Sequence, residues 1–291
     1  MMLDYRFYDI NKNICTEDIS MIFPNWKGEQ ERVAVFGPHD DDALIGASYA
    51  IRSAAANGAQ VYVVIFCSGN AGYTKIEEKD SICGVRKLET VEAYGKIGVP
   101  ADHILFFDYS DFSAAAYIGW QLDEQRTGTF PRVIQFLREK EITRLLIPNH
   151  YREHSDHTAV SEVGMYDAPQ ATDPILPDWG RAVNLSTVME YSVWADFSPE
   201  DMMLSGRTNN LRANLMIGAP EAEEKIVREG IEAYRSQGAI IKDLVNARET
   251  RRTGNGTYLE LYLALDPRPK LQFAPYIEFA EKLQEKEQEK A

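Results

Sequence analysis

The sequence predicts a protein of the α/β class, in which a mainly parallel sheet lies between layers of helices. Three observations lead to this prediction. Short apolar runs alternate along the chain with segments whose apolar residues recur at helical spacing. The runs are apolar at consecutive positions, which is typical of parallel strands covered on both faces. The chain has 291 residues, of which 44% are hydrophobic, and this is enough to bury a substantial core.

The alternation is clearest in the first half of the chain. We expect its strands at residues 32–37, 61–66, 104–107 and 145–148. The expected helices are residues 43–57, a segment through Arg86 that ends at Gly98, and residues 129–140. Strands joined by helices of this length form parallel βαβ units with right-handed crossovers.

The second half is less regular. Its expected strands are residues 187–194 and 258–263, and its expected helices are 220–237, 240–252 and a tail from 275. Together these elements predict a Rossmann-like three-layer α/β/α fold. We expect an N-terminal extension at 1–31, one α/β domain at 32–265 and a C-terminal helix or tail at 266–291.

Composition narrows the class of protein. With 31 Lys and Arg against 45 Asp and Glu, the formal charge is −14, which disfavours nucleic acid and anionic membranes as partners. The 3 cysteines form no Cys-x-x-Cys pair, as expected in a reducing cytoplasm. We find no signal-peptide pattern, no apolar run long enough to span a bilayer and no glycine-rich phosphate loop. We therefore expect a cytoplasmic protein that acts on a small molecule, with a homo-oligomer left open.

Four of the five histidines fall in two short stretches, each directly after an expected strand. His39 lies in Pro-His-Asp-Asp-Asp after residues 32–37, and the other three lie within residues 149–157 after 145–148. Ligands of parallel sheets bind beyond the carboxyl ends of the strands, so we expect both stretches on one rim. Imidazoles and carboxylates brought together in this way are typical ligands of zinc.

The spacing within each stretch suits a catalytic cation. His39 and Asp42 are three residues apart and can face one ion, which leaves Asp41 free to act as a general base. His154 and His157 have the same spacing. Asp156 is available to hold one imidazole in a fixed tautomer. Two His and one carboxylate around zinc leave a position open for water, whose pKa zinc lowers to about 7.

Each stretch also has a simpler interpretation when it is considered alone. The run Asp40–Asp42 could cap a helix and complement its dipole. The segment His154–His157 could be a solvated loop or a cap, and His103 beside Asp102 is best interpreted as structural. The position of both stretches after strands of one inferred sheet favours the metal site.

The motifs resemble those of the PIG-L/LmbE-type deacetylases. The segment Pro38–Gly46 is similar to the family's Pro-His-Pro-Asp-Asp-Glu-x-x-Gly, and His154–His157 to its His-x-Asp-His. Arg86-x-x-Glu89 resembles the family's Arg-x-x-Glu helix, and Tyr234–Gln237 its late Tyr-x-Ser-Gln segment. The resemblance covers roughly residues 32–240.

Members of this family are zinc-dependent hydrolases that remove an acyl group, usually acetyl, from the nitrogen of an amino sugar or its conjugate. The resemblance implies Zn²⁺, or another divalent cation, on His39, Asp42 and His157. It also implies that Asp41 is the general base. His154, oriented by Asp156, would polarise the amide or stabilise the oxyanion.

The resemblance further implies that Arg86 and Asp108 contact sugar hydroxyls, although a helix salt bridge and a loop cap are the alternatives for these two residues. The chain departs from the motif at Asp40, which replaces proline, and at Ala43, which replaces glutamate. Asp40 adds a third carboxylate, expected to tighten cation binding or to raise the pKa of Asp41 by repulsion. Ala43 removes an acceptor behind the ligands.

We therefore expect a metal-dependent hydrolase that removes an N-acyl, most simply an N-acetyl, group from an amino sugar or its conjugate. Two alternatives remain open at this point. One is a metal-dependent amidase acting on a larger conjugate. The other is a sugar- or metabolite-binding protein that has kept the metal site and lost turnover.

Overall fold

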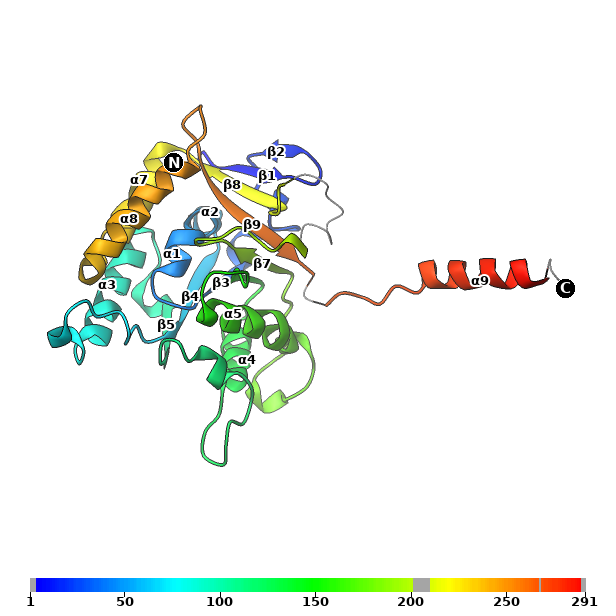
Figure 1. The fold of residues 1–291 in the computed structure, drawn as a ribbon, viewed down its shortest axis with the longest axis horizontal. Coiled ribbons are helices and arrows are strands. Elements are labelled where there is room, and N and C mark those ends of the chain that lie inside the picture. The colour runs from blue at the N-terminus through cyan, green and yellow to red at the C-terminus, as the bar shows by residue number, and fades with distance from the viewer. Residues whose placement is uncertain (1–3, 201–209, 267, 289–291) are drawn as a thin grey trace.

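A computed structural model describes residues 4–200, 210–266 and 268–288, and shows a mixed α/β fold around one central sheet (Figure 1). The first three residues of the expected extension and the last three of the expected tail lie outside the described residues. Nine strands of the described part form the sheet, in the order β2-β1-β8-β9-β7-β6-β3-β4-β5. Helices flank this sheet, in agreement with a three-layer α/β/α arrangement. The Rossmann-like description stays an expectation.

One half of the sheet is parallel, as predicted. It contains β3 (Arg32–Gly37), β4 (Gln60–Cys67), β5 (Ile104–Tyr109), β6 (Arg144–Pro148) and β7 (Thr187–Tyr191). The chain runs from β3 to β4 and β5, and then crosses back so that β6 pairs with the other side of β3. This reversal makes the gap between the ends of β3 and β6 a topological switch point, where α/β sheets bind ligands.

The other half of the sheet is antiparallel and was not predicted in full. Only β9 (Tyr258–Leu265) was expected from the sequence, while β1 (Arg6–Asp9), β2 (Ile14–Thr16) and β8 (Leu215–Ala219) were not. The strands β1 and β2 come from the segment expected as an N-terminal extension. They are short, and β2 is largely exposed, so they carry little apolar signal.

The helices form the outer layers because side chains alternate across the strands. Val33 and Val35 of β3 pack into one core, and Ala34 and Phe36 pack into the other. The first core is covered by α1 (Asp42–Gly46), α2 (Ser48–Ala56), α3 (Ile82–Lys96), α7 (Glu221–Ile231) and α8 (Gly238–Arg248). The second core is covered by α4 (Thr129–Glu139) and α5 (Ser155–Glu162).

A close approach of helix and sheet fixes the position of α1. A Cβ atom at Gly46 would lie 2.6 Å from the Tyr191 ring and 2.7 Å from the Ser192 carbonyl oxygen, so only glycine fits without a shift. The Tyr191 hydroxyl also donates to the carbonyl oxygen of Phe36 at 2.7 Å. These contacts hold α1 and the end of β3 against β7.

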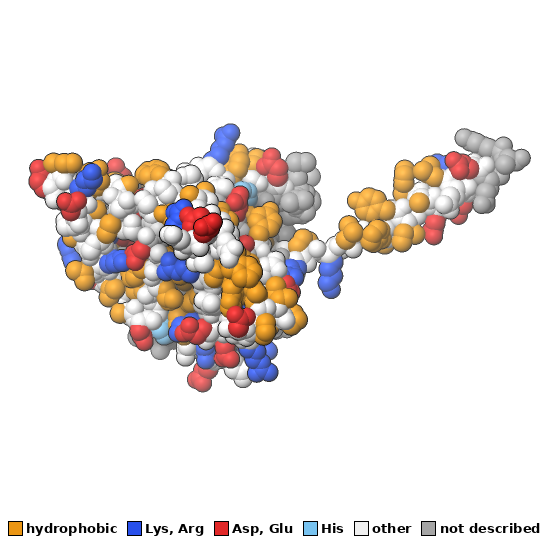
Figure 2. Space-filling view, turned by 90° about the horizontal axis from the view of Figure 1, so that it is seen from below, with side chains coloured by type: hydrophobic (Ala, Val, Ile, Leu, Met, Phe, Trp, Pro, Cys, Tyr) orange, Lys and Arg blue, Asp and Glu red, His pale blue; other side chains and the backbone are white. Residues whose placement is uncertain are grey.

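The tail forms the helix α9 (Ala274–Gln288), as expected. It projects away from the body in Figure 1, and Figure 2 shows hydrophobic side chains along it. Tyr276 and Phe279 are 69% and 65% exposed. None of the described helices is both long and apolar enough to cross a membrane.

Candidate metal centre

The two histidine stretches converge at the switch point of the sheet. His39 follows the end of β3 closely, and Asp42 is the first residue of α1. The second stretch follows β6 and leads into α5, which begins after His154. Since β3 and β6 are parallel neighbours, both stretches emerge at the same rim.

Three side chains face one point, and we call His39, Asp42 and His157 the histidine cluster. Asp42 Oδ2 lies 3.1 Å from His39 Nδ1 and 3.1 Å from His157 Nε2. The same oxygen accepts the main-chain N–H of His39 at 2.8 Å. One potential ligand atom from each residue lies within 4.8 Å of those of the other two. These are the three residues for which the family resemblance implied a metal-binding role, and they form a group that could hold an ion.

The cluster leaves two buried polar atoms without a hydrogen-bond partner among the described residues. These atoms are Asp42 Oδ1 and His157 Nε2. His157 Nε2 lies 3.1 Å from Asp42 Oδ2, but the two groups are not aligned for a hydrogen bond. Each unsatisfied buried group costs about 1–3 kcal/mol. A divalent cation between the three side chains would use these atoms as ligands, so the residues present fit such an ion.

Carboxylates behind the cluster orient both imidazoles. His39 Nε2 lies 3.2 Å from Asp156 Oδ2, and His157 Nδ1 lies 2.7 Å from Glu153 Oε2. With the proton of each neutral ring on these nitrogens, Nδ1 of His39 and Nε2 of His157 would be free to bind a cation next to Asp42. Such carboxylate–histidine pairs are typical of metal sites.

Glu153 was not predicted from the sequence. Its second oxygen accepts the main-chain N–H groups of residues 193, 194 and 195 at 2.9, 2.9 and 3.0 Å. The side chain is fully buried. Glu153 therefore joins His157 to the loop after β7. The signal available in the sequence was a glutamate four residues before an expected histidine ligand, within the same stretch.

The charges of the cluster reinforce one another. Burial opposes the ionised form of Asp42, but His157 and His39 outweigh it and hold the pKa of this carboxyl well below its usual range. Burial likewise opposes the charged form of His157, yet Asp42 and Glu153 raise the pKa of His157 to about 9. Without a cation, the positive charge that balances Asp42 is therefore carried by protons on the imidazoles.

Asp41 lies beside the cluster and is separate from it. Burial, followed by repulsion from Asp42, raises the pKa of Asp41 to about 6. Asp40 adds to the repulsion, in the direction expected from the sequence, while Arg86 at 3.7 Å opposes it. The Asp41 side chain is 15% exposed, so water can reach it.

His154 is the N-cap of α5 and has a defined tautomer. Its Nδ1 accepts the main-chain N–H of Asp156 at 3.1 Å, which places the proton of the neutral ring on Nε2. Burial, and then the neighbouring His39, lower the pKa of His154. The Asp156 carboxylate, expected to orient His154, lies 3.6 Å from His154 Nδ1, and it also contacts His39 and accepts the main-chain N–H groups of Phe112 and Ala114 at 2.7 and 3.0 Å.

The two residues expected to contact sugar hydroxyls lie in different surroundings. Arg86 is buried and donates to both oxygens of Asp40, through Nε at 2.9 Å and through its terminal nitrogen. Asp40 therefore faces Arg86 as an ion pair. Asp108 has a half-exposed side chain that pairs with Lys87 at 2.6 Å.

The two weaker sequence motifs meet behind the cluster. The Tyr234 hydroxyl donates to the carbonyl oxygen of Asp40 at 2.6 Å. Ser236 donates to Glu89 through its main-chain N–H at 2.9 Å and its hydroxyl at 2.7 Å. These contacts join the segment after α7 to α3 and to the turn that carries Asp41.

Comparison with known families gives a match over the part of the chain that carries both histidine stretches. Residues 34–166 match the family model PIG-L, described as GlcNAc-PI de-N-acetylase. This match confirms the resemblance noted from the motifs. No curated protein sequence matches the chain.

Solved structures share the fold at low sequence identity. N,N'-diacetylchitobiose deacetylase from Pyrococcus horikoshii has 17% identity and a TM-score of 0.59, over 86% of this chain and 88% of that chain. The conserved protein TT1542 from Thermus thermophilus has 20% identity and a TM-score of 0.60, over 83% and 98%. The 4-carboxy-2-hydroxymuconate hydratase GalB from Pseudomonas putida has 17% identity and a TM-score of 0.59, over 84% and 100%. These similarities establish the fold, which therefore hosts more than one chemistry.

Proposed function

Because residues 34–166 match the PIG-L family, we propose that this protein is a metal-dependent N-deacetylase. It hydrolyses the N-acyl group, in the first instance acetyl, of an amino sugar or amino-sugar conjugate. The observation that carries the proposal is the pair of unsatisfied buried atoms, Asp42 Oδ1 and His157 Nε2, next to an acid with a raised pKa. A cluster of this kind is useful only with a cation and a substrate.

His39, Asp42 and His157 would hold the ion. The donor set of two imidazoles and one carboxylate favours Zn²⁺, with another divalent cation as the alternative. When bound, such a cation supplies Lewis acidity and lowers the pKa of water to about 7.

The chain's own residues handle the protons and the developing charge. Asp41, with a pKa of about 6, is mostly ionised at pH 7 and still basic enough to take a proton from the attacking water. It then returns the proton to the departing amine. His154 presents Nε2–H to the carbonyl oxygen and stabilises the negative charge that develops there.

We assign positioning roles to two further residues. Asp156 holds His39 and the 112–114 loop, and supports His154 through its main-chain N–H and through its carboxylate, 3.6 Å from His154 Nδ1. Arg86 attracts the Asp41 carboxylate by its charge and forms an ion pair with Asp40. We also propose that Arg86 and Asp108 contact sugar hydroxyls of the substrate. We also keep the expected domain at 32–265 and a cytoplasmic location as proposals.

Acetate release from N-acetylglucosamine, after loading with Zn²⁺, tests this function. Asp41→Asn should lower kcat/KM by about 10²–10⁴-fold while bound metal, measured by elemental analysis, stays at the wild-type level. Asp102→Asn, a change outside the cluster, is the matched control and should keep full activity. Undiminished turnover by Asp41→Asn would refute the assignment of the base.

A further inference from the structure

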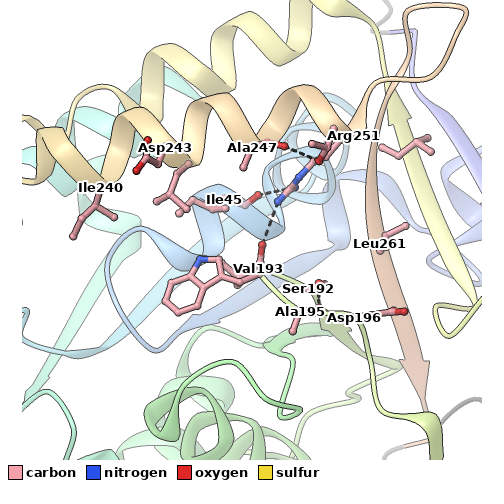
Figure 3. Close-up of a pocket in the computed structure, with 14 residues that line it drawn as sticks. Ile45, Ser192, Val193, Ala195, Asp196, Ile240, Asp243, Ala247, Arg251 and Leu261 are labelled. Atoms are coloured by element: carbon pink, nitrogen blue, oxygen red, sulfur yellow. Dashed lines mark hydrogen bonds between the residues drawn. The ribbon is translucent and has the colours of Figure 1, made fainter.

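A pocket of about 620 Å³ lies between α8, β9 and the loop after β7 (Figure 3). Its walls are α8, the strand β9 and residues 192–196, the loop that Glu153 holds. Most of its lining is apolar and includes Trp194, Ile240, Leu244, Ala247, Leu259 and Leu261. The volume lies in the range of small-molecule sites, which are about 300–1,000 Å³.

The pocket and the histidine cluster are linked through Trp194 and Glu153. The ring of Trp194, which lines the pocket, lies 5.3 Å from the ring of His157 between centroids. Glu153 bonds both to His157 and to the main-chain N–H of Trp194. On the opposite wall, Ile45 belongs to α1, the helix that begins at Asp42. Trp194 therefore lies at the edge shared by the cluster and the pocket, within reach of a group attached to a substrate at the cluster.

The charges at the pocket do not suit an anion. Among the described residues that line it, Arg251 is the only cationic side chain, and its nitrogens donate to the carbonyl oxygens of Ile45 at 3.0 Å and Val193 at 3.3 Å (Figure 3). The other charged lining residues are Asp196 and Asp243. A phosphate in this pocket would meet two carboxylates and a guanidinium already bound to the main chain.

We propose that this pocket binds an uncharged apolar group carried by the substrate, next to the amino sugar. The proposal rests on the proposed function, and it narrows the substrate class to apolar conjugates. It disfavours substrates with a phosphate beside the sugar. The apolar group could be joined through the glycosidic oxygen or could be a long N-acyl chain, and the experiment separates these two sources.

The first test compares defined substrates on the Zn²⁺-loaded protein. We expect octyl N-acetyl-β-D-glucosaminide to have a KM about tenfold or more below that of the methyl glycoside, because the alkyl chain leaves water. N-acetylglucosamine 1-phosphate should have the highest KM of the three substrates. A comparable gain for N-octanoylglucosamine over N-acetylglucosamine, with none for the octyl glycoside, would assign the pocket to the acyl chain.

A variant that fills the pocket gives the second test. Ala247→Phe, on the exposed side of α8, should abolish the advantage of the octyl compound and leave kcat/KM for the methyl glycoside unchanged. Asn246→Phe is the matched control, because it adds the same ring to a neighbouring exposed position outside the pocket. The control should keep the full advantage of the octyl chain.

Binding of octyl β-D-glucoside, which has no amide to hydrolyse, provides a readout independent of turnover. Calorimetry should show binding to the wild-type protein that Ala247→Phe weakens at least tenfold and Asn246→Phe does not. Turnover of the methyl glycoside without any effect of alkyl length or of Ala247→Phe would overturn the pocket proposal alone. Absence of turnover with every substrate would refute the proposed deacetylase activity. Calorimetry would still show whether the pocket binds an alkyl chain.

Discussion

Two buried charged clusters of this molecule differ in how completely their polar atoms are paired. In the first, Arg248 donates to Glu224 at 2.8 and 2.6 Å and to the carbonyl oxygen of Ile45 at 2.6 Å. Glu260 accepts the main-chain N–H of Tyr49 at 2.8 Å and the hydroxyl of Tyr262 at 2.7 Å. We call Arg248, Glu224 and Glu260 the Arg248 cluster. The histidine cluster, in which Asp42 and His157 are fully buried, leaves Asp42 Oδ1 and His157 Nε2 unpaired among the described residues.

This difference in pairing distinguishes a cluster that stabilises the fold from one that is a candidate functional site. A buried ion pair whose atoms are all satisfied holds α7, α8 and β9 together. An incompletely paired cluster costs stability, which is expected where the side chains are arranged for binding or catalysis. Burial and charge alone would not have distinguished the two clusters.

The largest expected effect is the loss of the metal site. Asp42→Ala removes the carboxylate that both imidazoles face, so bound Zn²⁺ should fall from one per chain to near zero. Activity should fall about 10⁴-fold or more, equivalent to about 5.5 kcal/mol. Elemental analysis and acetate release measure these losses, and Asp173→Ala, in a surface ion pair, is the control. Retention of metal by Asp42→Ala would remove the distinction between the clusters.

The next effect falls on the Arg248 cluster and concerns stability. Arg248→Met leaves Glu224 and Glu260 without their buried cation, and should lower the free energy of unfolding by about 3–5 kcal/mol in urea titrations. Metal binding of the folded fraction should stay unchanged. Arg235→Met, which breaks an exposed pair with Glu92, should cost less than about 1 kcal/mol. Equal losses in the two variants would contradict the comparison.

A smaller effect is expected for the carboxylate behind His157. Glu153→Gln keeps an acceptor for the 193–195 loop but weakens the orientation of His157, so Zn²⁺ affinity should fall about 10–100-fold. Competition with a chelator measures this affinity. Glu153→Ala should lose more, since three main-chain N–H groups then lack their acceptor. An affinity of Glu153→Gln equal to that of wild type would show that Glu153 serves the loop alone.

The smallest effect comes from an unpaired acid outside both clusters. Burial raises the pKa of Asp167 to about 6, and its Oδ2 has no partner among the described residues. An acid whose pKa is raised by folding stabilises the folded state at pH values below its unfolded pKa of about 4. This stabilisation is lost as the pH rises through the folded pKa of about 6. Asp167→Asn should therefore be more stable than wild type by about 1 kcal/mol at pH 8, after discounting for partial exposure, and not at pH 4. Urea unfolding at both pH values checks the sign.

The parallel half of the sheet could be predicted because its signal is local. Residues 61–66 are apolar at every position and lie within the buried strand β4. The strand β8 was missed because it is short and contains Gly218, and β1 because it has four residues and pairs with a strand more than 200 positions away. Such pairing is decided by tertiary structure, which no local pattern reports.

The same distinction applies to the site. The convergence of the two histidine stretches follows from strand ends and residue spacing, and so could be expected, whereas the choice of His157 rather than His154 rested on the family resemblance. The role of Glu153 depends on a loop forty residues away, and Asp156 turned out to face His39 because the 112–114 loop binds it. Supporting contacts of this kind come from separate elements of the fold, so no spacing in the sequence reports them.

The pairing of β1 with β8 also sets an order of events during synthesis. Arg6 lies opposite Gly218 in this pair, so the two positions are 212 residues apart. At about 5–20 residues per second, a ribosome needs about 10–40 s to make the chain between them. The strand β1 is therefore translated long before β8 and can pair only with β2 while the parallel half is completed, so the pairing of β1 with β8 closes late.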